Sequence, residues 1–366
     1  MTTVVTTTIN IPLVLKKYAE NAKLFGHQEV RFIVIGDRKS KSGTREFCES
    51  ITRNYYPCEY LDLDDQKRYL ERFPQLWTHL PFDSIQRRNI GILKAFEDGA
   101  RVIVTVDDDN WILNQDFVTH HNIVGSVIEL PTYESSSGWF NVCSVLEERN
   151  GIRFYHRGYP IKMRWTEENA FLSVARIRAP VAVNAGLWLD DPDVDALTRL
   201  YHQPVVVSIK EGTPDTFALH PGTWCPFNSQ NTALTRETIP AYFLSPYVGR
   251  YDDIWASYVV TRIAEHLKHV VAFGKPLVWQ RRNEHDLWKD FDAERNGMIL
   301  TDDFCQALRA IGLRGAEFHE CFGEVIEGLE CLWKGSSLCA SLLQWRTQFL
   351  DGLRIWHEVF QRISGF

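Results

Sequence analysis

Residues 102–110 read Val-Ile-Val-Thr-Val-Asp-Asp-Asp-Asn, a β-branched run that leads directly into three carboxylates. The run from Val102 to Val106 predicts a buried strand of a parallel sheet. Ligands of open α/β sheets bind beyond the carboxyl ends of the strands, which is where Asp107, Asp108 and Asp109 stand. Adjacent carboxylates repel one another unless a cation compensates, and their oxygens suit Mn²⁺ or Mg²⁺ bound to substrate phosphates. We therefore expect a metal site with Asp107 and Asp109 as ligands.

The residues before this strand predict the beginning of a doubly wound α/β fold. Three β-branched segments alternate with two helical segments, and this order is typical of a mostly parallel sheet. No G-x-G-x-x-G follows the first strand, so a dinucleotide fingerprint is absent. Asp37 follows the second strand and is a candidate base or ribose ligand. The expected strands are Thr2–Asn10, Val30–Ile35 and Cys58–Leu63, and the expected helices are Leu13–Phe25 and Thr44–Asn54.

The composition of the 366-residue chain is that of a soluble globular protein. Hydrophobic residues make up 45% of it and charged residues 24%, which are ordinary values. The formal net charge of −7 argues against a nucleic-acid partner, which would need a basic surface. The eight cysteines form no C-x-x-C pair, so zinc and redox motifs have no support. Because no apolar run reaches ~18 residues and the first residues do not resemble a signal peptide, we expect a cytoplasmic protein without a membrane span.

Two arginines of the central region are candidate ligands for an anion. Arg88 lies in a helix expected from Ser84 to Glu97. Its side chain either reaches the substrate phosphates or the acids at 107–109, or it makes only a local ion pair at a solvated helix start. Arg157 lies in His-Arg-Gly-Tyr-Pro at 156–160, a turn whose glycine and proline can aim its side chain at a ligand. The segment 135–141, Ser-Ser-Ser-Gly-Trp-Phe-Asn, is expected to be a mobile loop near the site.

Further charged residues cluster in three places. Asp252 and Asp253 precede a helix expected over Ile254–His269, so we expect one as its N-cap and the other to face a ligand. Four carboxylates lie within residues 190–195, and we interpret most of them as solvated residues of a capped loop. The segment 280–285, Gln-Arg-Arg-Asn-Glu-His, adds two arginines and a histidine that could bind phosphates.

The last part of the chain, from about residue 296, is predicted to be helical. One apolar stripe at helical spacing predicts a face that docks onto the core, with self-association into a homo-oligomer as the alternative. We therefore expect a catalytic domain over residues 1–290 and a helical C-terminal extension over residues 291–366. The stripe consists of Leu338, Leu342, Trp345, Phe349, Leu353, Trp356, Phe360 and Ile363.

Several of these segments together resemble a known family. In order along the chain, they are similar to blocks of the reversibly glycosylated polypeptides, or UDP-arabinopyranose mutases, of glycosyltransferase family 75. The resemblance covers about residues 4–290. A single Asp-x-Asp is a weak signal, whereas four ordered blocks are a strong one. The blocks are 104–109, 156–160 with Arg164, 186–196, and 249–256 followed by 277–279.

The resemblance implies a GT-A-like fold, a UDP-sugar substrate and a divalent cation, usually Mn²⁺. It also implies interconversion of pyranose and furanose rings and reversible glycosylation, in which Arg157 matches the implicated arginine. A metal held by Asp107 and Asp109, with help from Arg88, would stabilise the departing diphosphate. Asp108 would point to the sugar or the ribose. Arg157 would either capture the glycosyl group or act as an electrostatic clamp. The clamp is the alternative because a guanidinium stays protonated in proteins and is then a poor nucleophile.

The remaining expected roles and the competing functions follow from the same blocks. Asp252 or Asp253 would hold sugar hydroxyls or act as a base, and Arg164 would help bind the nucleotide-sugar. Residues 280–283 depart from the family pattern, which would suit a glycosyltransferase that acts on a small acceptor. A self-glycosylating binding protein without turnover is the third alternative.

Overall fold

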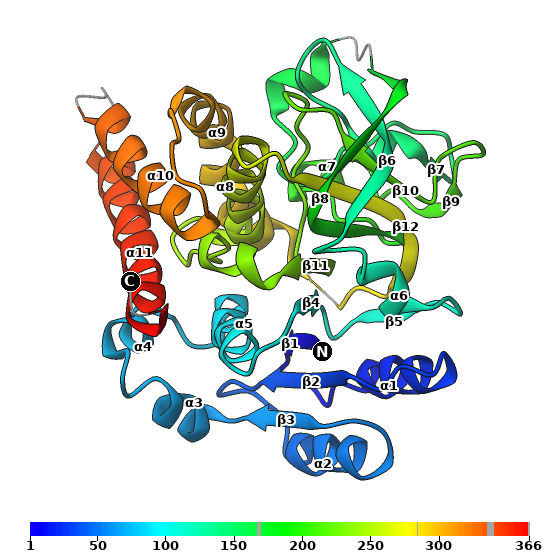
Figure 1. Cartoon of the computed structure of the whole chain (residues 1–366), viewed down its shortest axis with the longest axis vertical. Helices are drawn as coiled ribbons and strands as arrows, with labels where there is room; N and C mark the ends of the chain where they lie inside the picture. Colours follow the sequence, from blue (N-terminus) through cyan, green and yellow to red (C-terminus); the bar gives the residue numbers. More distant parts are fainter. Residues whose placement is uncertain (167–169, 284, 335–339, 365–366) are drawn as a thin grey trace.

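The computed structural model describes residues 1–166, 170–283, 285–334 and 340–364, without the side chains of 170–175, 340–342 and 364. Within these ranges twelve strands form one sheet in the order β3-β2-β1-β4-β11-β8-β6-β10-β12-β5, while β9 pairs with β8 and β7 with β9 (Figure 1). The strands are β1 Thr2–Thr7, β2 Val30–Ile35, β3 Cys58–Leu61, β4 Val102–Val106, β5 Asn110–Ile112, β6 Val127–Ser135, β7 Leu146–Glu148, β8 Ala170–Asp190, β9 Val206–Ile209, β10 Thr216–Leu219, β11 Asn231–Thr235 and β12 Val270–Gln280. The α-helices are α1 Val14–Leu24, α2 Thr44–Asn54, α3 Leu63–Tyr69, α4 Pro74–His79, α5 Arg88–Glu97, α6 Phe117–His121, α7 Ala196–Tyr201, α8 Asp252–His266, α9 Leu287–Ala310, α10 Phe318–Trp333 and α11 Ala340–Ser364.

The N-terminal half of the sheet has the predicted parallel arrangement. Strand β1 lies between β2 and β4 and runs parallel to both, and β3 extends the sheet beyond β2. Every residue of β4 is buried, which explains why its sequence is apolar throughout instead of alternating. Beyond β4 the sheet is mixed, because β11 pairs antiparallel with both β4 and β8. This arrangement confirms the predicted α/β fold class.

Two strand pairings bring distant segments of the chain to the carboxyl end of β4. Asn110, the first residue of β5, pairs with Gln280, the last residue of β12. Gln280 also pairs with Asp190 at the end of β8, because β8 and β12 run parallel. The three acids that follow β4 therefore meet the segments that follow β8 and β12. These segments are separated by about 80 residues or more along the chain, and only the sheet register joins them.

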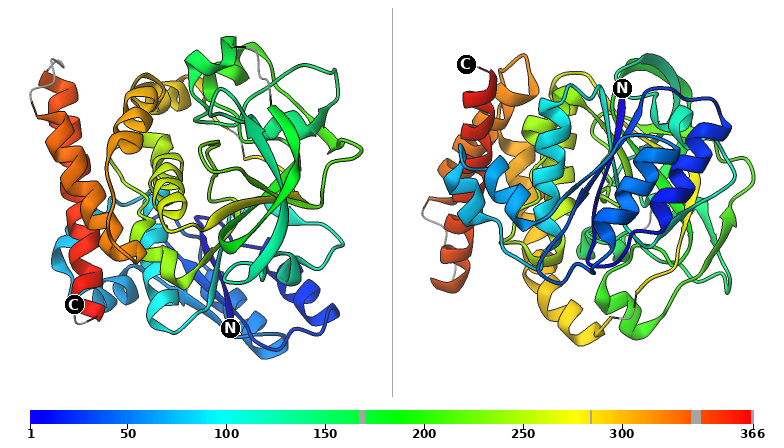
Figure 2. Two further views of the ribbon diagram at one scale, coloured as in Figure 1. Left: turned by 45° about the horizontal axis from the view of Figure 1, so that its top comes forward. Right: turned by 90° about the horizontal axis from the view of Figure 1, so that it is seen from below.

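Helices α9–α11 stand together on one side of the molecule, away from β6, β7 and β9 (Figures 1 and 2). The apolar stripe of α11 docks onto the core as predicted. Trp356, for example, stacks on Phe243 at a ring-centroid distance of 5.2 Å and donates from Nε1 to the carbonyl of Ile239. The buried members of the stripe are Trp345, Phe349, Leu353, Trp356 and Phe360. Leu338 and the side chain of Leu342 lie outside the described residues.

The first helix of this group also belongs to the core around α8. Helix α9 begins at Leu287, so the domain boundary predicted between residues 290 and 291 falls within its first turn. Thr301 of α9 accepts a hydrogen bond from Nε1 of the buried Trp255 in α8, at 3.0 Å. The division into two domains stays a prediction. Within the described ranges, no helix combines the length and the apolar character that crossing a membrane requires.

Replacing Gly158 is expected to destabilise the fold strongly, because a Cβ atom at this position would overlap a neighbouring side chain. The φ of Gly158 is +82°, and a Cβ atom there would lie 2.2 Å from Cγ2 of Ile254. Gly151 has a similar φ of +70°, but a Cβ atom there would meet nothing within 4 Å. We expect Gly151→Ala to lower the free energy of unfolding by about 1–2 kcal/mol through the left-handed backbone alone. Gly158→Ala should cost about 1–3 kcal/mol more through the overlap. Equal losses of the two variants in urea unfolding would contradict this account.

Candidate functional site

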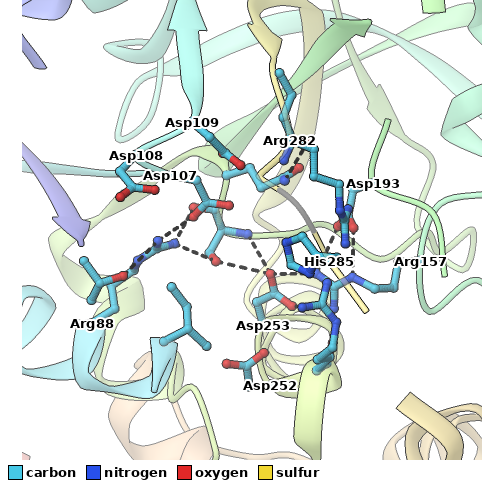
Figure 3. Close-up of a pocket in the computed structure, with 16 residues that line it drawn as sticks. Arg88, Asp107, Asp108, Asp109, Arg157, Asp193, Asp252, Asp253, Arg282 and His285 are labelled. Carbon is cyan, nitrogen blue, oxygen red and sulfur yellow. Dashed lines mark hydrogen bonds and ion pairs between the residues drawn. The ribbon is translucent and has the colours of Figure 1, made fainter. Parts of the chain in front are cut away.

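A cavity of about 220 Å³ opens at the carboxyl end of β4 (Figure 3). It brings together seven of the predicted site residues, which come from four parts of the chain. Its wall is completed by Ser229 and Gln230, which the sequence did not single out, and by Asp193 of the acid cluster at 190–195. The predicted residues that line the cavity are Arg88, Asp107, Asp108, Asp109, Arg157, Asp252 and Asp253. Asp37 and Arg164, the other two predicted residues, do not line it.

Asp37 lies instead in a neighbouring cavity of about 200 Å³ at the ends of β1 and β2. Its carboxylate accepts a hydrogen bond from the backbone N–H of Ser84 at 3.2 Å, and the nearest cation is Nε of Arg87 at 4.0 Å. Asp108 lines both cavities and accepts from Oγ1 of Thr8 at 2.5 Å. The two cavities thus adjoin at Asp108, which separates the site of Asp37 from that of the other acids.

Arg88 is buried at the floor of the cavity and binds Asp107, the first acid after β4. Its Nη2 lies 2.5 Å from Oδ1 of Asp107, and its Nη1 donates to the carbonyl and to Oγ of Ser229, both at 2.9 Å. The side chain is fully buried, so the alternative of a solvated helix start is wrong. Of the two sequence-based interpretations, the structure supports the one in which Arg88 reaches the acids.

Asp109 carries an uncompensated carboxylate beside Asp107. Burial, followed by repulsion from Asp107 and Asp108, raises its pKa to about 7. Its Oδ1 is buried and has no hydrogen-bond partner in the described structure. A hard divalent cation would satisfy this oxygen and relieve the repulsion, so Asp107 and Asp109 fit Mn²⁺ or Mg²⁺. No cluster of three His, Cys, Asp or Glu within the described ranges could hold a metal alone. Substrate phosphates and water would therefore have to complete the coordination.

Arg157 is clamped between two carboxylates on the opposite wall of the cavity (Figure 3). Its Nε and Nη2 donate to the two oxygens of Asp193 at 2.9 and 3.0 Å, and its Nη1 lies 3.0 Å from Oδ1 of Asp253. Nη1 also donates to the carbonyl of Arg250. Burial opposes the charged form, but the attraction of Asp193 and Asp253 outweighs it and raises the pKa of Arg157 well above its usual value. The guanidinium therefore stays charged.

Two acids of the segment 190–195 are not the solvated loop residues that we expected. Asp193 is only 2% exposed, and although burial alone would raise its pKa, Arg157 holds the pKa below its usual value. Asp195 caps α7 by accepting from the N–H of Thr198 at 2.8 Å, as expected of a capped loop, but it is fully buried. It binds Arg164, which explains why Arg164 lies behind the wall of the cavity and not on it.

Asp252 and Asp253 are both buried in the first turn of α8, and neither is its N-cap. Tyr251 holds the N-cap position without a side-chain hydrogen bond, so the prediction that one acid caps this helix is wrong. Asp253 accepts from the N–H of Ser229 at 3.0 Å and also binds Arg157. Asp252 accepts from Nε2 of Gln86 at 2.9 Å. Burial, and then repulsion from Asp253, raises the pKa of Asp252 to about 7.

Replacing Asp252 by asparagine is expected to stabilise the fold at pH 8 and to change little at pH 4. The carboxyl has a pKa near 4 in the unfolded chain and about 7 in the folded one. The folded state therefore binds the extra proton between these values, and the destabilisation by Asp252 grows as the pH rises from about 4 to about 7. We expect a gain of roughly 1–3 kcal/mol at pH 8. Urea unfolding at pH 4, 6 and 8 measures it, and a gain that does not depend on pH would contradict the assignment.

Two basic residues that follow β12 complete the rim of the cavity. Arg282 and His285 both line it and share one carboxylate, Asp290 of α9, at 3.5 and 3.1 Å. Trp139, by contrast, does not line the cavity. It is buried and packs edge-on against Tyr258 at 5.8 Å between ring centroids. The segment 135–141, expected to be a mobile loop near the site, is therefore part of the packed core at Trp139.

Solved structures that resemble this chain share little sequence with it. Glucosyl-3-phosphoglycerate synthase from Mycobacterium tuberculosis, in complex with Mn²⁺, UDP-glucose and phosphoglyceric acid, is 11% identical, with a TM-score of 0.42 over 84% of this chain and 80% of that one. Residues 1–349 of S. aureus TarS are 10% identical, with a TM-score of 0.35 over 99% of this chain and 91% of that one. Likenesses at this level carry no argument about function.

The similarity to curated proteins is higher but partial. UDP-arabinopyranose mutase 3 of Arabidopsis thaliana is 28% identical over 219 residues, which are 58% of this chain and 56% of that protein. Probable UDP-arabinopyranose mutase 1 of Zea mays is 31% identical over 210 residues, 56% of this chain and 53% of that protein. The chain thus spans about half the length of the curated relatives it matches.

A family-level comparison covers more of the chain. Residues 73–332 match the family described as reversibly glycosylated polypeptide. The matched region is well over half of the sequence and includes the three acids after β4, Arg157, Asp193 and the acid pair that begins α8. It also includes α9 and nearly all of α10, which we had assigned to a separate extension. The chain belongs to the reversibly glycosylated polypeptide family.

Proposed function

We propose that this chain is a metal-dependent mutase that interconverts the pyranose and furanose forms of a UDP-sugar. The observation that carries the proposal is the cavity itself, where Asp107 and Asp109 on one wall face Arg157 with its carboxylates Asp193 and Asp253 on the other (Figure 3). One wall suits a metal-bound diphosphate, and the other suits a sugar that becomes positively charged. The names of the curated relatives support the same activity.

In this proposal the nucleotide-sugar occupies both cavities. The nucleoside lies in the cavity of Asp37, with Asp108 at the junction facing the ribose. Asp107 and Asp109 would hold Mn²⁺ or Mg²⁺, and the bound cation would supply positive charge against the diphosphate. Arg88 fixes the position of Asp107 through their 2.5 Å contact, and it adds positive charge at the same wall. Cleavage of the anomeric C–O bond then leaves the sugar next to Arg157.

Arg157 acts here as an electrostatic clamp. Its guanidinium nitrogens Nε, Nη1 and Nη2 all donate to oxygen atoms, and its pKa is raised well above the usual value. A guanidinium in this state has no lone pair to offer a glycosyl group. Its role is to hold Asp193 and Asp253 ionised and oriented, so that their carboxylates stabilise the positive charge of the released sugar.

Asp252 is the group we assign to proton transfer. After the bond between the anomeric carbon and the diphosphate breaks, a different sugar hydroxyl bonds to the anomeric carbon and loses its proton, which gives a bicyclic acetal. The bond from the anomeric carbon to the former ring oxygen then breaks as that oxygen takes up a proton, and a diphosphate oxygen bonds to the anomeric carbon again. A single carboxyl can accept the first proton and return it to the second oxygen, so the reaction is an isomerisation without net proton change. The pKa of Asp252, raised to about 7 by burial and Asp253, suits both steps near neutral pH.

The direct test is to incubate the protein with UDP-arabinopyranose and other UDP-pyranoses in the presence of Mn²⁺. Proton NMR should show the corresponding UDP-furanose appearing without accumulation of free UDP. If no candidate sugar nucleotide, tested from either ring form, is interconverted, the proposal is wrong.

A glycosyltransferase acting on a small acceptor is the second candidate. The observation that favours it is the basic rim of Arg282 and His285, which lies where the sequence departs from the family pattern. The same incubations with and without small anionic acceptors distinguish the two functions, because a transferase releases UDP only when its acceptor is present. Intact-mass measurement in parallel detects a stable sugar adduct, which would indicate a self-glycosylating protein without turnover.

A further inference from the structure

Glu294 of α9 connects two segments that hold Arg157, although it does not line the cavity itself. Its side chain is 1% exposed. One carboxylate oxygen accepts from Nε of Arg250 at 3.0 Å, and the other accepts from the N–H of Ala196 at 2.7 Å. Arg250 holds Arg157 through its carbonyl oxygen, and Ala196 begins the helix that follows Asp193. A single buried carboxylate therefore contacts both segments that hold the side chain of Arg157.

Helix α9 also packs directly against the turn that contains Arg250. A Cβ atom on Gly249 would lie 2.0 Å from the carbonyl oxygen of Ala293, and a Cβ atom on Gly297 would lie 2.3 Å from Cγ of Tyr251. At Gly249 the two backbones approach closely, and at Gly297 the backbone of α9 meets the ring of Tyr251, so neither position leaves room for a Cβ atom. The turn from Gly249 to Tyr251 thus rests on α9 over its whole length, with Glu294 between the two contacts along the helix.

We propose that Glu294 is a positioning residue for Arg157, which it holds in place through Arg250. This inference rests on the proposed function, in which Arg157 is the clamp beside the reacting sugar. It assigns a role in the site to the helical region that the sequence suggested was separate from the catalytic domain. Arg250 keeps a second, weaker partner in Asp290 at 3.5 Å, so loss of the Glu294 contact should loosen the turn without unfolding it.

The variant Glu294→Gln isolates this contact because it preserves the size of the side chain. Both partners of Glu294, the Nε–H of Arg250 and the N–H of Ala196, are hydrogen-bond donors. The amide nitrogen of glutamine is also a donor, so it would face one of these two N–H groups without accepting a hydrogen bond from it. A control is Glu324→Gln in α10, because Glu324 also accepts from two N–H groups, here the backbone groups of Arg314 and Gly315, but it contacts neither Arg250 nor α7 and does not line the cavity.

The test is an NMR spectrum of the full chain labelled with ¹⁵N-arginine, which needs no substrate. The Nε–Hε signal of Arg157 is identified by its absence in Arg157→Lys. In the unchanged protein, the Hε proton of Arg157 should exchange slowly with water. We expect at least about tenfold faster exchange or a clear shift in Glu294→Gln, and no change in Glu324→Gln. A second variant, Ala196→Pro, removes one donor to Glu294 at a helix position that tolerates proline, and should move the signal in the same direction. An unchanged Arg157 signal in both variants, or an equal change in the control, would overturn the proposal.

Catalysis gives an independent readout. If the mutase activity is present, Glu294→Gln should lower kcat about tenfold and leave the Kd for UDP unchanged, because neither the acids after β4 nor the nucleoside cavity is altered. An unchanged kcat, or a loss confined to UDP binding, would count against a positioning role. If the unchanged protein shows no mutase activity, the proposed function fails, and the NMR comparison still decides whether Glu294 positions Arg157.

Discussion

Arg157→Lys is expected to lower kcat for sugar interconversion by about 10²–10³-fold while the Kd for UDP stays within a few-fold of its original value. Lysine keeps the positive charge but not the planar fork of donors, so it cannot bind Asp193 and Asp253 at once in the geometry described above. The carboxylates then lose their fixed orientation toward the sugar, and the stabilisation of the transition state falls accordingly. Steady-state kinetics together with calorimetric titration of UDP separates the two effects.

Arg164→Lys provides the matched control for this prediction. Arg164 also binds a buried carboxylate, Asp195, from the same segment of the chain, but it lies outside the cavity. We expect comparable losses of stability in the two lysine variants and a loss of kcat only for Arg157. The variant Arg157→Ala would go further, because it leaves Asp193 and Asp253 buried without a counter-charge, at a cost of about 3–5 kcal/mol. Equal losses of kcat in the two lysine variants would contradict the clamp role.

Asp109→Asn should abolish metal-dependent turnover, with a loss of about 10³-fold or more in kcat. It should also weaken Mn²⁺ binding measured in the presence of UDP. Asparagine keeps one neutral oxygen but removes the charge that pairs with the cation, and the described residues offer no cluster of three His, Cys, Asp or Glu to replace it. In the unchanged protein, chelation with EDTA should stop turnover and added Mn²⁺ should restore it.

Asp108→Asn is the control for the metal prediction. Asp108 accepts a hydrogen bond from Thr8 and lies where the two cavities adjoin. We therefore expect the loss of the Asp108 carboxylate to raise KM and the Kd for UDP, while the affinity for Mn²⁺ in the presence of UDP changes little. A variant of Asp109 that retains full Mn²⁺ affinity, or an enzyme that is fully active after exhaustive chelation, would show that these acids do not form a metal site.

Local sequence signals predicted the first and last residues of several elements correctly. Strands β2 and β4 and helix α2 have the expected bounds, because each is a short run whose apolar spacing suffices to define it. The long strand β8, from Ala170 to Asp190, is the opposite case. Its ends are set by pairing with β6, β11 and β12. Such pairing joins residues far apart in the chain and leaves no periodic signal in any one segment.

The residues of the site were likewise predictable where the signal is local and not where it depends on contacts between distant segments. The acids after β4 and the turn at Arg157 were predictable because a strand end and a glycine-proline turn are local patterns. Asp193 was misjudged because its partner Arg157 is 36 residues away, and the cluster around it has the composition of a solvated loop. The available signal was its place in one of the family-like blocks. For Glu294 there was no signal, because its role depends on how α9 packs.

The central claim is that the sugar leaves the diphosphate before its ring changes size, and positional isotope exchange tests it most directly. The substrate is a UDP-sugar with ¹⁸O in the oxygen that bridges the anomeric carbon and the β-phosphate, incubated with the protein and Mn²⁺. If the bond breaks, the freed β-phosphate can rotate, and ³¹P NMR should show ¹⁸O moving into non-bridging positions at least as fast as the furanose appears. Ring interconversion that leaves the ¹⁸O in the bridging position would contradict the account.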